Sequence, residues 1–378
     1  MLDARFTESA LVHIGDNAKD GRRDDWKTRL GHSAKNVSSL VVRGVLSPDE
    51  QQALETVEKR HKTFVSDYYL NLIDPDDSNC PIRLQAIPHI DELDDDERVE
   101  SDPTGDNAHR VNQALIHRYP NRVLLTPTHI CPMYCRYCFR KVALNDGQIR
   151  YHKAVPQALE YIEKKTEISE VILSGGDPLI LSNQRLGALI EQLVSISHVR
   201  RIRIHTRMPV TFPYRIDQEF IRALGRPQQI YLVSHFNHPR ELTPLAISKL
   251  EMMRDSGFIL ANQSVLLKGV NDAPKVLAEL YNELGYIGVR PYYLHHLDPA
   301  PGTAHFRVSL RRGKRIYRKL LKLLSGPDRP RYVIEVPGGG GKVDVDSDAV
   351  VELEQPGLYR MMSPLNDHPV HWVDPSAE

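Results

Sequence analysis

Three of the four cysteines in this 378-residue chain lie within eight residues, in the segment ICPMYCRYCFRK at positions 130–141. The C-x3-C-x2-C spacing places Cys131, Cys135 and Cys138 on one short loop. Thiolates are the usual ligands of iron–sulfur clusters, which commonly take four cysteines. A cluster bound by only three keeps one iron open to a small molecule. The spacing therefore favours an iron–sulfur cluster with an open coordination position.

A zinc site is the structural alternative, because three cysteines and a histidine form a known zinc ligand set and the chain has 17 histidines. Zinc loops, however, usually pair two closely spaced ligands with a second pair further along the chain. The triplet has no second cysteine pair. The fourth cysteine, Cys80, is expected to be an incidental small hydrophobe rather than a ligand.

The composition predicts an ordinary soluble protein, with 41% hydrophobic and 26% charged residues. Forty-nine basic side chains balance 49 acidic ones, which argues against a nucleic-acid partner. Residues 1–25 lack the apolar segment of a signal peptide, and no stretch is apolar enough to span a membrane. We expect a cytoplasmic protein with no membrane partner.

Strands and helices alternate regularly from about residue 121. Helical spacing marks the segments 183–196, 242–257 and 272–285. Such alternation predicts a parallel sheet with right-handed crossovers. The apolar, β-branched runs that predict strands lie at residues 122–130, 170–176, 200–207, 229–237, 258–267 and 289–297.

Polar side chains recur where these predicted strands end, and active sites of (βα) barrels are built at those ends. This favours an α/β fold with a partial (βα)6 barrel of the TIM type over a doubly wound sheet. The polar residues at the strand ends are His129, Asp177, Arg207, His235, Gln263 and Asp298.

Three domains are expected along the chain. Residues 1–110 form a helical N-terminal region that ends in an acidic segment, 91–107, which we expect to be solvated. Residues 111–328 form the barrel and include a basic helix at 311–324, which is expected to be an amphipathic surface helix. Residues 329–378 form a C-terminal segment with a strand at 331–336 and the glycine run PGGGGK at 337–342.

The cysteine motif resembles that of radical S-adenosylmethionine (SAM) enzymes, and residues 110–345 resemble the lysine 2,3-aminomutase family. The resemblance includes, in order, HRYPNRVLL, SGGDPL, HFNHP, NQSVLLKGVND, PYYLHHLD and PGGGGK. It implies that Cys131, Cys135 and Cys138 hold a [4Fe-4S] cluster whose open iron binds SAM. One electron, from a reductant such as flavodoxin or ferredoxin, then splits SAM into methionine and a 5'-deoxyadenosyl radical.

The segment SGGDPL follows a predicted strand, and its two glycines allow a close approach of the backbone to a ligand. The resemblance implies that Gly175, Gly176 or Asp177 contacts the amino group of SAM, and that Gln263 lies on the SAM side. By itself the segment would be a tight turn with a helix cap. Tyr137 is expected to pack either beside the adenine or against the cluster alone.

The glycine run puts Lys342 on a loop that is able to fit around a flat cofactor, although by itself the run would be a flexible hinge. A phosphate-binding Walker A loop would need Ser or Thr after the lysine, where this chain has Val343. The resemblance implies that Lys342 forms a Schiff base with pyridoxal 5'-phosphate (PLP). It also implies that Arg118 and Arg122 bind the PLP phosphate.

The substrate residues implied by the resemblance are Arg140, for an amino acid carboxylate, and two acids, Asp298 and Glu335, for a cationic side chain. Glu335 stands where the lysine enzymes have a second Asp. Its extra methylene leaves open whether the substrate is lysine or arginine. The glutamate-specific branch of the family does not keep both acids. The branch that modifies lysine for elongation factor P lacks the four-glycine run.

We therefore predict an isomerase, a radical SAM and PLP-dependent aminomutase that interconverts L-lysine and β-lysine. An arginine 2,3-aminomutase, or a lysine 2,3-aminomutase that serves elongation factor P, is the alternative. The expected partners are a small amino acid with a cationic side chain and a one-electron reductant, and the chain could form a homo-oligomer.

Overall fold

A computed structural model describes residues 26–94, 99–144, 151–225, 229–366 and 368–376. The N-terminal segment without a signal peptide pattern, residues 1–25, lies outside the described residues. Within the described ranges, no helix has the length and apolar character needed to cross a membrane.

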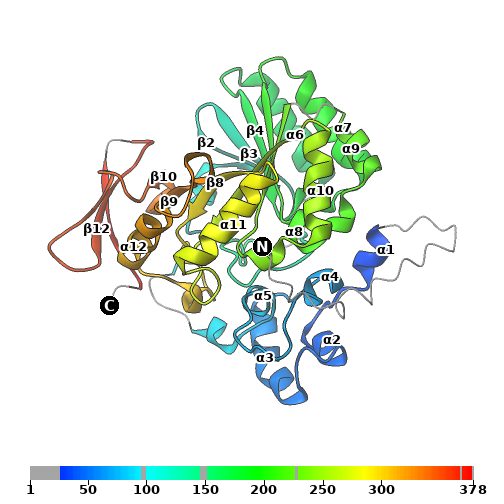
Figure 1. The fold of residues 1–378 in the computed structure, drawn as a ribbon. Helices are drawn as coiled ribbons and strands as arrows, with labels where there is room; N and C mark the ends of the chain where they lie inside the picture. The colour runs from blue at the N-terminus through cyan, green and yellow to red at the C-terminus, as the bar shows by residue number, and fades with distance from the viewer. Residues whose placement is uncertain (1–25, 95–98, 145–150, 226–228, 367, 377–378) are drawn as a thin grey trace.

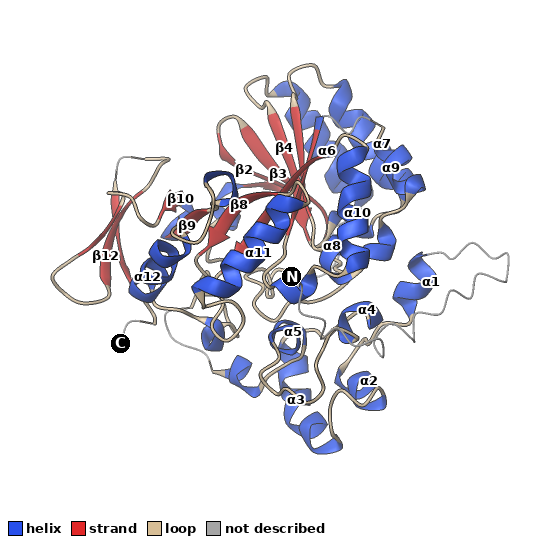
Figure 2. Cartoon of the chain, in the orientation of Figure 1, coloured by secondary structure: helices blue, strands red, loops and turns tan. Residues whose placement is uncertain are grey.

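A ten-stranded sheet lies at the centre of the molecule, and its strands pair in chain order from β1 to β10 (Figures 1 and 2). Strands β3 to β9 run parallel, whereas β1, β2 and β10 are antiparallel to their neighbours. The predicted α/β fold with a parallel sheet is therefore confirmed. The bounds are β1 (Arg110–Asn112), β2 (Leu115–Tyr119), β3 (Arg122–Thr128), β4 (Glu170–Gly175), β5 (Arg201–His205), β6 (Ile230–Ser234), β7 (Ile259–Val265), β8 (Arg290–His295), β9 (Arg331–Val336) and β10 (Gly341–Asp344).

Helices connect the parallel strands and pack on the outer face of the sheet (Figure 2). The predicted helices correspond to α7, α10 and α11, and their ends follow local capping: Ser182 caps α7, and Thr243 caps α10 ahead of Pro244. Polar caps and proline at the first turn therefore fix these boundaries. The bounds are α6 (Tyr151–Lys164), α7 (Asn183–Ser195), α8 (Met208–Thr211), α9 (Gln218–Leu224), α10 (Pro244–Asp255), α11 (Pro274–Tyr286) and α12 (Leu310–Leu320).

Side chains of the parallel strands alternate between two environments. On β5, Ile202 and Ile204 are buried in the hydrophobic core under the helices, whereas Arg203 and His205 line a central cavity. This follows from the two-residue period of a strand, which sends successive side chains to opposite faces. On β5 the outer face is thus apolar and the inner face is polar.

The sheet curves until side chains from its two ends meet. Arg118 on β2 forms an ion pair with Glu335 on β9, although the two strands are seven positions apart in the sheet. The hydroxyl of Tyr119 accepts a hydrogen bond from the backbone N–H of Lys342 at 3.2 Å. Within the described residues, the two ends of the sheet are therefore bridged by side-chain contacts and not by backbone pairing between strands.

The N-terminal region is helical, as predicted, and lies at one end of the sheet (Figure 1, blue). It contacts the cysteine loop through the backbone: the N–H of Tyr134 donates to the carbonyl of Phe64, and the N–H of Arg136 donates to that of Gln85, both at 3.0 Å. The helices are α1 (Trp26–Gly31), α2 (Val37–Val42), α3 (Pro48–Arg60), α4 (Asp67–Leu70) and α5 (Pro81–Ala86), with the 3-10 helices η2 (Ile90–Leu93) and η3 (Asp106–His109).

The acidic segment is not solvated throughout, which corrects the expectation from its charge. Glu92 is fully buried, and its carboxylate pairs with Arg136, between two motif cysteines, and with Lys141 at 2.8 Å. Burial raises the pKa of Glu92, but the two cations more than offset burial and lower this pKa to about 2. Asp106 is also buried and ion-paired. The segment thus anchors the cysteine loop instead of acting only as a linker.

Lys342 lies on a strand and not on a loop. The glycine run makes a tight turn between β9 and β10, with positive φ at Gly338, Gly339 and Gly341. Lys342 pairs with Glu335 across these two strands. The C-terminal part thereby continues the main sheet and then forms a separate small sheet of β11 (Val350–Glu352), β12 (Leu358–Met362) and β13 (Pro369–Val373).

The basic helix α12 is an amphipathic surface helix, as predicted. Its apolar side chains, including Ile316 and Leu320, are buried. Arg311, Arg312 and Arg318 form ion pairs with carboxylates from other elements. Much of its charge is therefore balanced within the chain.

The buried Glu92 cluster predicts a large effect on stability. Glu92→Gln leaves two buried cations without a counter-charge, which should cost about 3–5 kcal/mol of unfolding free energy. The fall should appear as a lower midpoint in urea denaturation followed by fluorescence. The control is Glu160→Gln, which removes an exposed ion pair with Lys164 and should leave the midpoint unchanged. Equal midpoints for the two variants would contradict the prediction.

Candidate active site

One cavity of about 940 Å³ lies against the inner face of the sheet, at the upper end of the range for small-molecule sites. Its wall includes inward-facing residues of β3 to β8, the three motif cysteines and Lys342. The curvature of the sheet therefore brings the two predicted cofactor motifs, 200 or more positions apart in the sequence, to the same cavity.

The cysteine loop follows β3 and is fixed by the loop after β4. The N–H of Gly176 donates to the carbonyl of Thr128 at 2.8 Å, and the N–H of Asp177 donates to that of Ile130 at 2.9 Å. A Cβ on Gly176 would lie 2.4 Å from the carbonyl oxygen of Ile130, so only glycine fits this approach. SGGDPL therefore holds the start of the cysteine loop, whatever else it binds.

The three thiols fit the expected iron–sulfur cluster in number and chemistry. All three are free and line the cavity, and their location away from bulk water raises the pKa of Cys131 strongly and that of Cys138 to about 11. The neighbouring thiols raise these pKa values further. Three thiolates can therefore gather here only with a compensating positive charge, which a metal cluster supplies.

No three His, Cys, Asp or Glu side chains converge on a point suited to a single metal ion within the described ranges. Cys80 is fully buried in the N-terminal region, where its sulfur accepts a hydrogen bond from the N–H of Asp74 at 3.4 Å. The donor set at the cavity thus has three cysteines, as the motif implies.

The residues expected on the SAM side, Gly175, Gly176, Asp177, Gln263 and Tyr137, all line this cavity. The carboxylate of Asp177 is already bonded within the protein, since it accepts from the hydroxyl of Thr206 at 2.8 Å and from the N–H of Leu179 at 3.0 Å. Asp177 therefore also fixes the loops that follow β4 and β5.

The side chains of Gln263 and Tyr137 both contact neighbouring rings. The amide of Gln263 hydrogen-bonds to His235 and, at 3.3 Å, to His295. The ring of Tyr137 lies edge-on to Phe306, with 6.3 Å between the centroids. These contacts fix the orientation of both side chains in the ligand-free cavity.

Four of the residues expected to bind PLP and substrate form one chain of alternating charges together with Asp106. Lys342 Nζ lies 2.6 Å from a carboxylate oxygen of Glu335, and Glu335 also pairs with Arg118. Arg118 also forms an ion pair with Asp106 at 2.7 Å, and Asp106 pairs with Arg140 at 2.6 Å. Each of these five charges thus has a partner of opposite sign within the protein.

Lys342 and the two arginines fit a cofactor with a phosphate and an aldehyde. The cavity location lowers the pKa of Lys342, but the carboxylate of Glu335 more than offsets this and raises the pKa above its usual value. Arg122 also lines the cavity, with its guanidinium 3.6 Å from the ring centroid of Tyr119. A primary amine and two guanidinium groups are thus available at one end of the cavity.

Asp298 lies in the cavity wall near Glu335 and Lys342. Removal from bulk water, together with the negative charge of Glu335, raises the pKa of Asp298 to about 7. An arriving cation would favour the ionised form of this carboxyl. The site is therefore suited to a ligand with a positive charge.

Sequence reasoning assigned no site role to Asp106, Arg207 or Glu241. Asp106 lies in the acidic segment, where it looked like a surface charge. Arg207 was visible only as one polar residue at a strand end, and Glu241 follows the HFNHP motif by two positions. Nothing in the sequence shows which charges they meet.

Comparison with known proteins agrees with this geometry. Residues 125–280 match the family model described as the Radical SAM superfamily. The chain is 38% identical over 336 residues to the L-lysine 2,3-aminomutase of Fusobacterium nucleatum subsp. nucleatum, covering 89% of this chain and 79% of that protein. It is 37% identical to the L-lysine 2,3-aminomutase of Clostridium subterminale, with 89% and 81% covered.

A relative with another substrate in its name is almost as similar. The glutamate 2,3-aminomutase of Clostridioides difficile is 36% identical over 329 residues, covering 85% of this chain and 77% of that protein. Overall identity therefore does not separate the substrates, and the cavity residues must.

The close approach at Gly176 predicts a defect in cluster assembly. Gly176→Ala should displace the start of the cysteine loop, at an overpacking cost of about 1–3 kcal/mol. We expect less iron and sulfide per chain after anaerobic purification. Gly31→Ala is the control, because no atom lies within 4 Å of a Cβ there. Wild-type iron content in Gly176→Ala would show that the loop tolerates the displacement.

Proposed function

Because the chain belongs to the lysine 2,3-aminomutase family of the radical SAM superfamily, we propose that it is a PLP-dependent isomerase that interconverts L-lysine and β-lysine. The reaction moves the α-amino group to the β-carbon. One observation carries the proposal: a single cavity is lined by the cysteine triplet, Asp298 and Lys342, and Lys342 is paired with Glu335.

The motif cysteines would hold the [4Fe-4S] cluster beside bound SAM, and Lys342 would hold PLP with its phosphate on Arg118 and Arg122. When bound, the cluster and SAM would supply a carbon radical, and PLP would supply a conjugated ring that stabilises an unpaired electron while the amino group moves. The cavity would keep the reacting carbon in place and limit its contact with water, which a radical reaction requires.

The Glu335–Lys342 pair is the strongest support for a lysine substrate. Glu335 already binds the ε-ammonium of a lysine side chain at 2.6 Å. When Lys342 turns to its cofactor, Glu335 is free to bind the ε-ammonium of the substrate in its place. One cation thus replaces another of the same kind, so that no buried charge is left without a partner.

Asp298 and Arg140 would hold the rest of the substrate. Asp298 would become the second acceptor for the ε-ammonium, since a cation lowers the pKa of a carboxyl that the cavity holds at about 7. Arg140 would bind the substrate carboxylate with the fork geometry that guanidinium groups provide. That guanidinium also pairs with Asp106 at 2.6 Å.

Two alternatives differ in substrate. An arginine 2,3-aminomutase is favoured by Glu335, because the longer acid stands where the lysine enzymes have Asp. A lysine enzyme that serves elongation factor P is disfavoured by the four-glycine run before Lys342. A glutamate substrate would place a third negative charge near Asp298 and Glu335, which makes it the least favourable of the family substrates.

We also propose details of the fold, the cellular location, the electron donor and the oligomeric state. The parallel strands and their helices would form the partial (βα)6 radical SAM barrel of residues 111–328. A helical region precedes it, and the Lys342 segment follows. The protein would work in the cytoplasm with flavodoxin or ferredoxin as electron donor, and could form a homo-oligomer.

Product analysis tests the function. Protein purified without oxygen should contain iron, sulfide and PLP, and with dithionite and SAM it should convert lysine to β-lysine, as measured by mass-resolved chromatography. Lys342→Ala should keep its iron and lose the product. β-Arginine as the main product would show that the substrate is arginine. Zinc in place of iron would disprove the radical mechanism.

The extra methylene of Glu335 predicts a shift in substrate preference. Glu335→Asp should raise the lysine-to-arginine ratio of kcat/KM, because it restores the acid that stands at this position in the lysine enzymes. Asp298→Glu is the matched control. It lengthens the other acid and should lower the lysine-to-arginine ratio of kcat/KM. An unchanged ratio in Glu335→Asp would show that this methylene does not select the substrate.

A further inference from the structure

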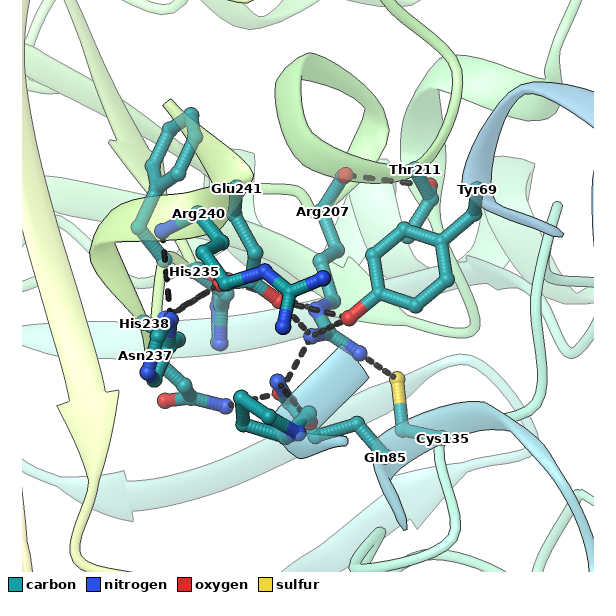
Figure 3. A network of polar contacts seen from close by, with 12 residues as sticks. Tyr69, Gln85, Cys135, Arg207, Thr211, His235, Asn237, His238, Arg240 and Glu241 are labelled. Atoms are coloured by element: carbon teal, nitrogen blue, oxygen red, sulfur yellow. Dashed lines mark hydrogen bonds and ion pairs between the residues drawn. The ribbon is translucent and has the colours of Figure 1, made fainter. Parts of the chain in front are cut away.

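Arg207 follows β5, and its buried guanidinium reaches the second cysteine of the motif (Figure 3). Its Nη1 donates to Cys135 Sγ at 2.9 Å. Its Nη2 donates to a carboxylate oxygen of Glu241 at 2.7 Å and to the side-chain oxygen of Gln85 at 2.6 Å. An arginine has five N–H donors in a planar fork. The other contacts therefore fix the plane of the guanidinium and direct one N–H at the sulfur.

Glu241, the counter-charge, is itself fixed. It is fully buried in the 3-10 helix η7 (Pro239–Glu241). One carboxylate oxygen accepts the N–H groups of Asn237 and His238, at 2.7 and 3.1 Å. The other accepts the hydroxyl of Tyr69, from the N-terminal region, at 2.6 Å. Three parts of the chain thus hold one buried ion pair beside the cysteine loop.

A cation at a sulfur ligand has a direct consequence for an iron–sulfur cluster. One-electron reduction adds a negative charge, and hydrogen bonds to the sulfurs are among the factors that set the reduction potential. A charge-assisted hydrogen bond is roughly twice as strong as a neutral one. Arg207 would therefore stabilise the reduced form more than the oxidised form.

We propose that Arg207 is a positioning residue that raises the reduction potential of the cluster through its hydrogen bond to Cys135, and that Glu241 limits this effect. The proposal rests on the proposed function, since it requires the cluster. One electron passes from a low-potential donor to the oxidised cluster. No covalent bond changes and no proton moves, because the guanidinium keeps its charge.

The test is a redox titration of the full chain with dithionite, in which the reduced cluster is followed by electron paramagnetic resonance. Arg207→Gln keeps all three cysteine ligands and removes the charge. We expect a tenfold fall in the equilibrium constant for one-electron reduction, which is a shift of about 59 mV to more negative potential. Arg207→Lys, which keeps the charge, should recover part of the shift.

Glu241→Gln should shift the potential in the opposite direction, because it removes the negative charge that partly cancels Arg207. Arg240→Gln is the matched control. It removes an arginine next to Glu241 whose guanidinium donates to the carbonyl of Leu72 and not to the sulfur. Its potential should equal that of the wild type.

Equal potentials for the wild type and Arg207→Gln, with the cluster retained in both, would overturn the proposal and leave the proposed function intact. A shift of the same size in Arg240→Gln would overturn it as well. If Arg207→Gln does not fold, Glu241→Gln decides, because an upward shift supports the proposal and no shift or a downward one overturns it. A wild-type protein without a cluster would instead refute the proposed function.

Discussion

The ion pair between Arg118 and Glu335 is the contact on which the site depends, since it joins the two ends of the curved sheet. An open sheet with strands in chain order would leave the cysteine loop after β3 and Lys342 on β10 far apart. Curvature, with side chains bridging the ends, places both against the same cavity. The distance between the two cofactor motifs is thus set by the closure of the sheet.

Charge compensation explains how this cavity tolerates so many ionised groups. From Lys342 to Arg140, cations and anions alternate, so each buried charge has a partner. The same groups are those expected to bind a phosphate, a carboxylate and an ammonium. We expect binding to exchange partners within the network, because it offers charges of both signs to a ligand.

The cysteine loop is held from two sides. The N-terminal region provides Glu92, which binds Arg136 and Lys141, and the loops after the strands provide Gly176 and the Arg207 ion pair. Residues 129–144, which follow β3, form no helix or strand, so their position depends on these contacts with other parts of the chain. The helical N-terminal region thus forms part of the support for the proposed cluster.

The sequence by itself determined the cysteine triplet, the parallel strands β3 to β8 and the helices α7, α10 and α11, because spacing, periodicity and capping are local. Tertiary structure alone decided that Lys342 sits on a strand, that Glu92 and Asp106 are buried, and that Arg207 meets Cys135. Arg118 and Glu335 lie 217 positions apart, and Arg207 and Cys135 lie 72 apart. Which charges meet over such distances depends on how the sheet curves, and no local pattern records it.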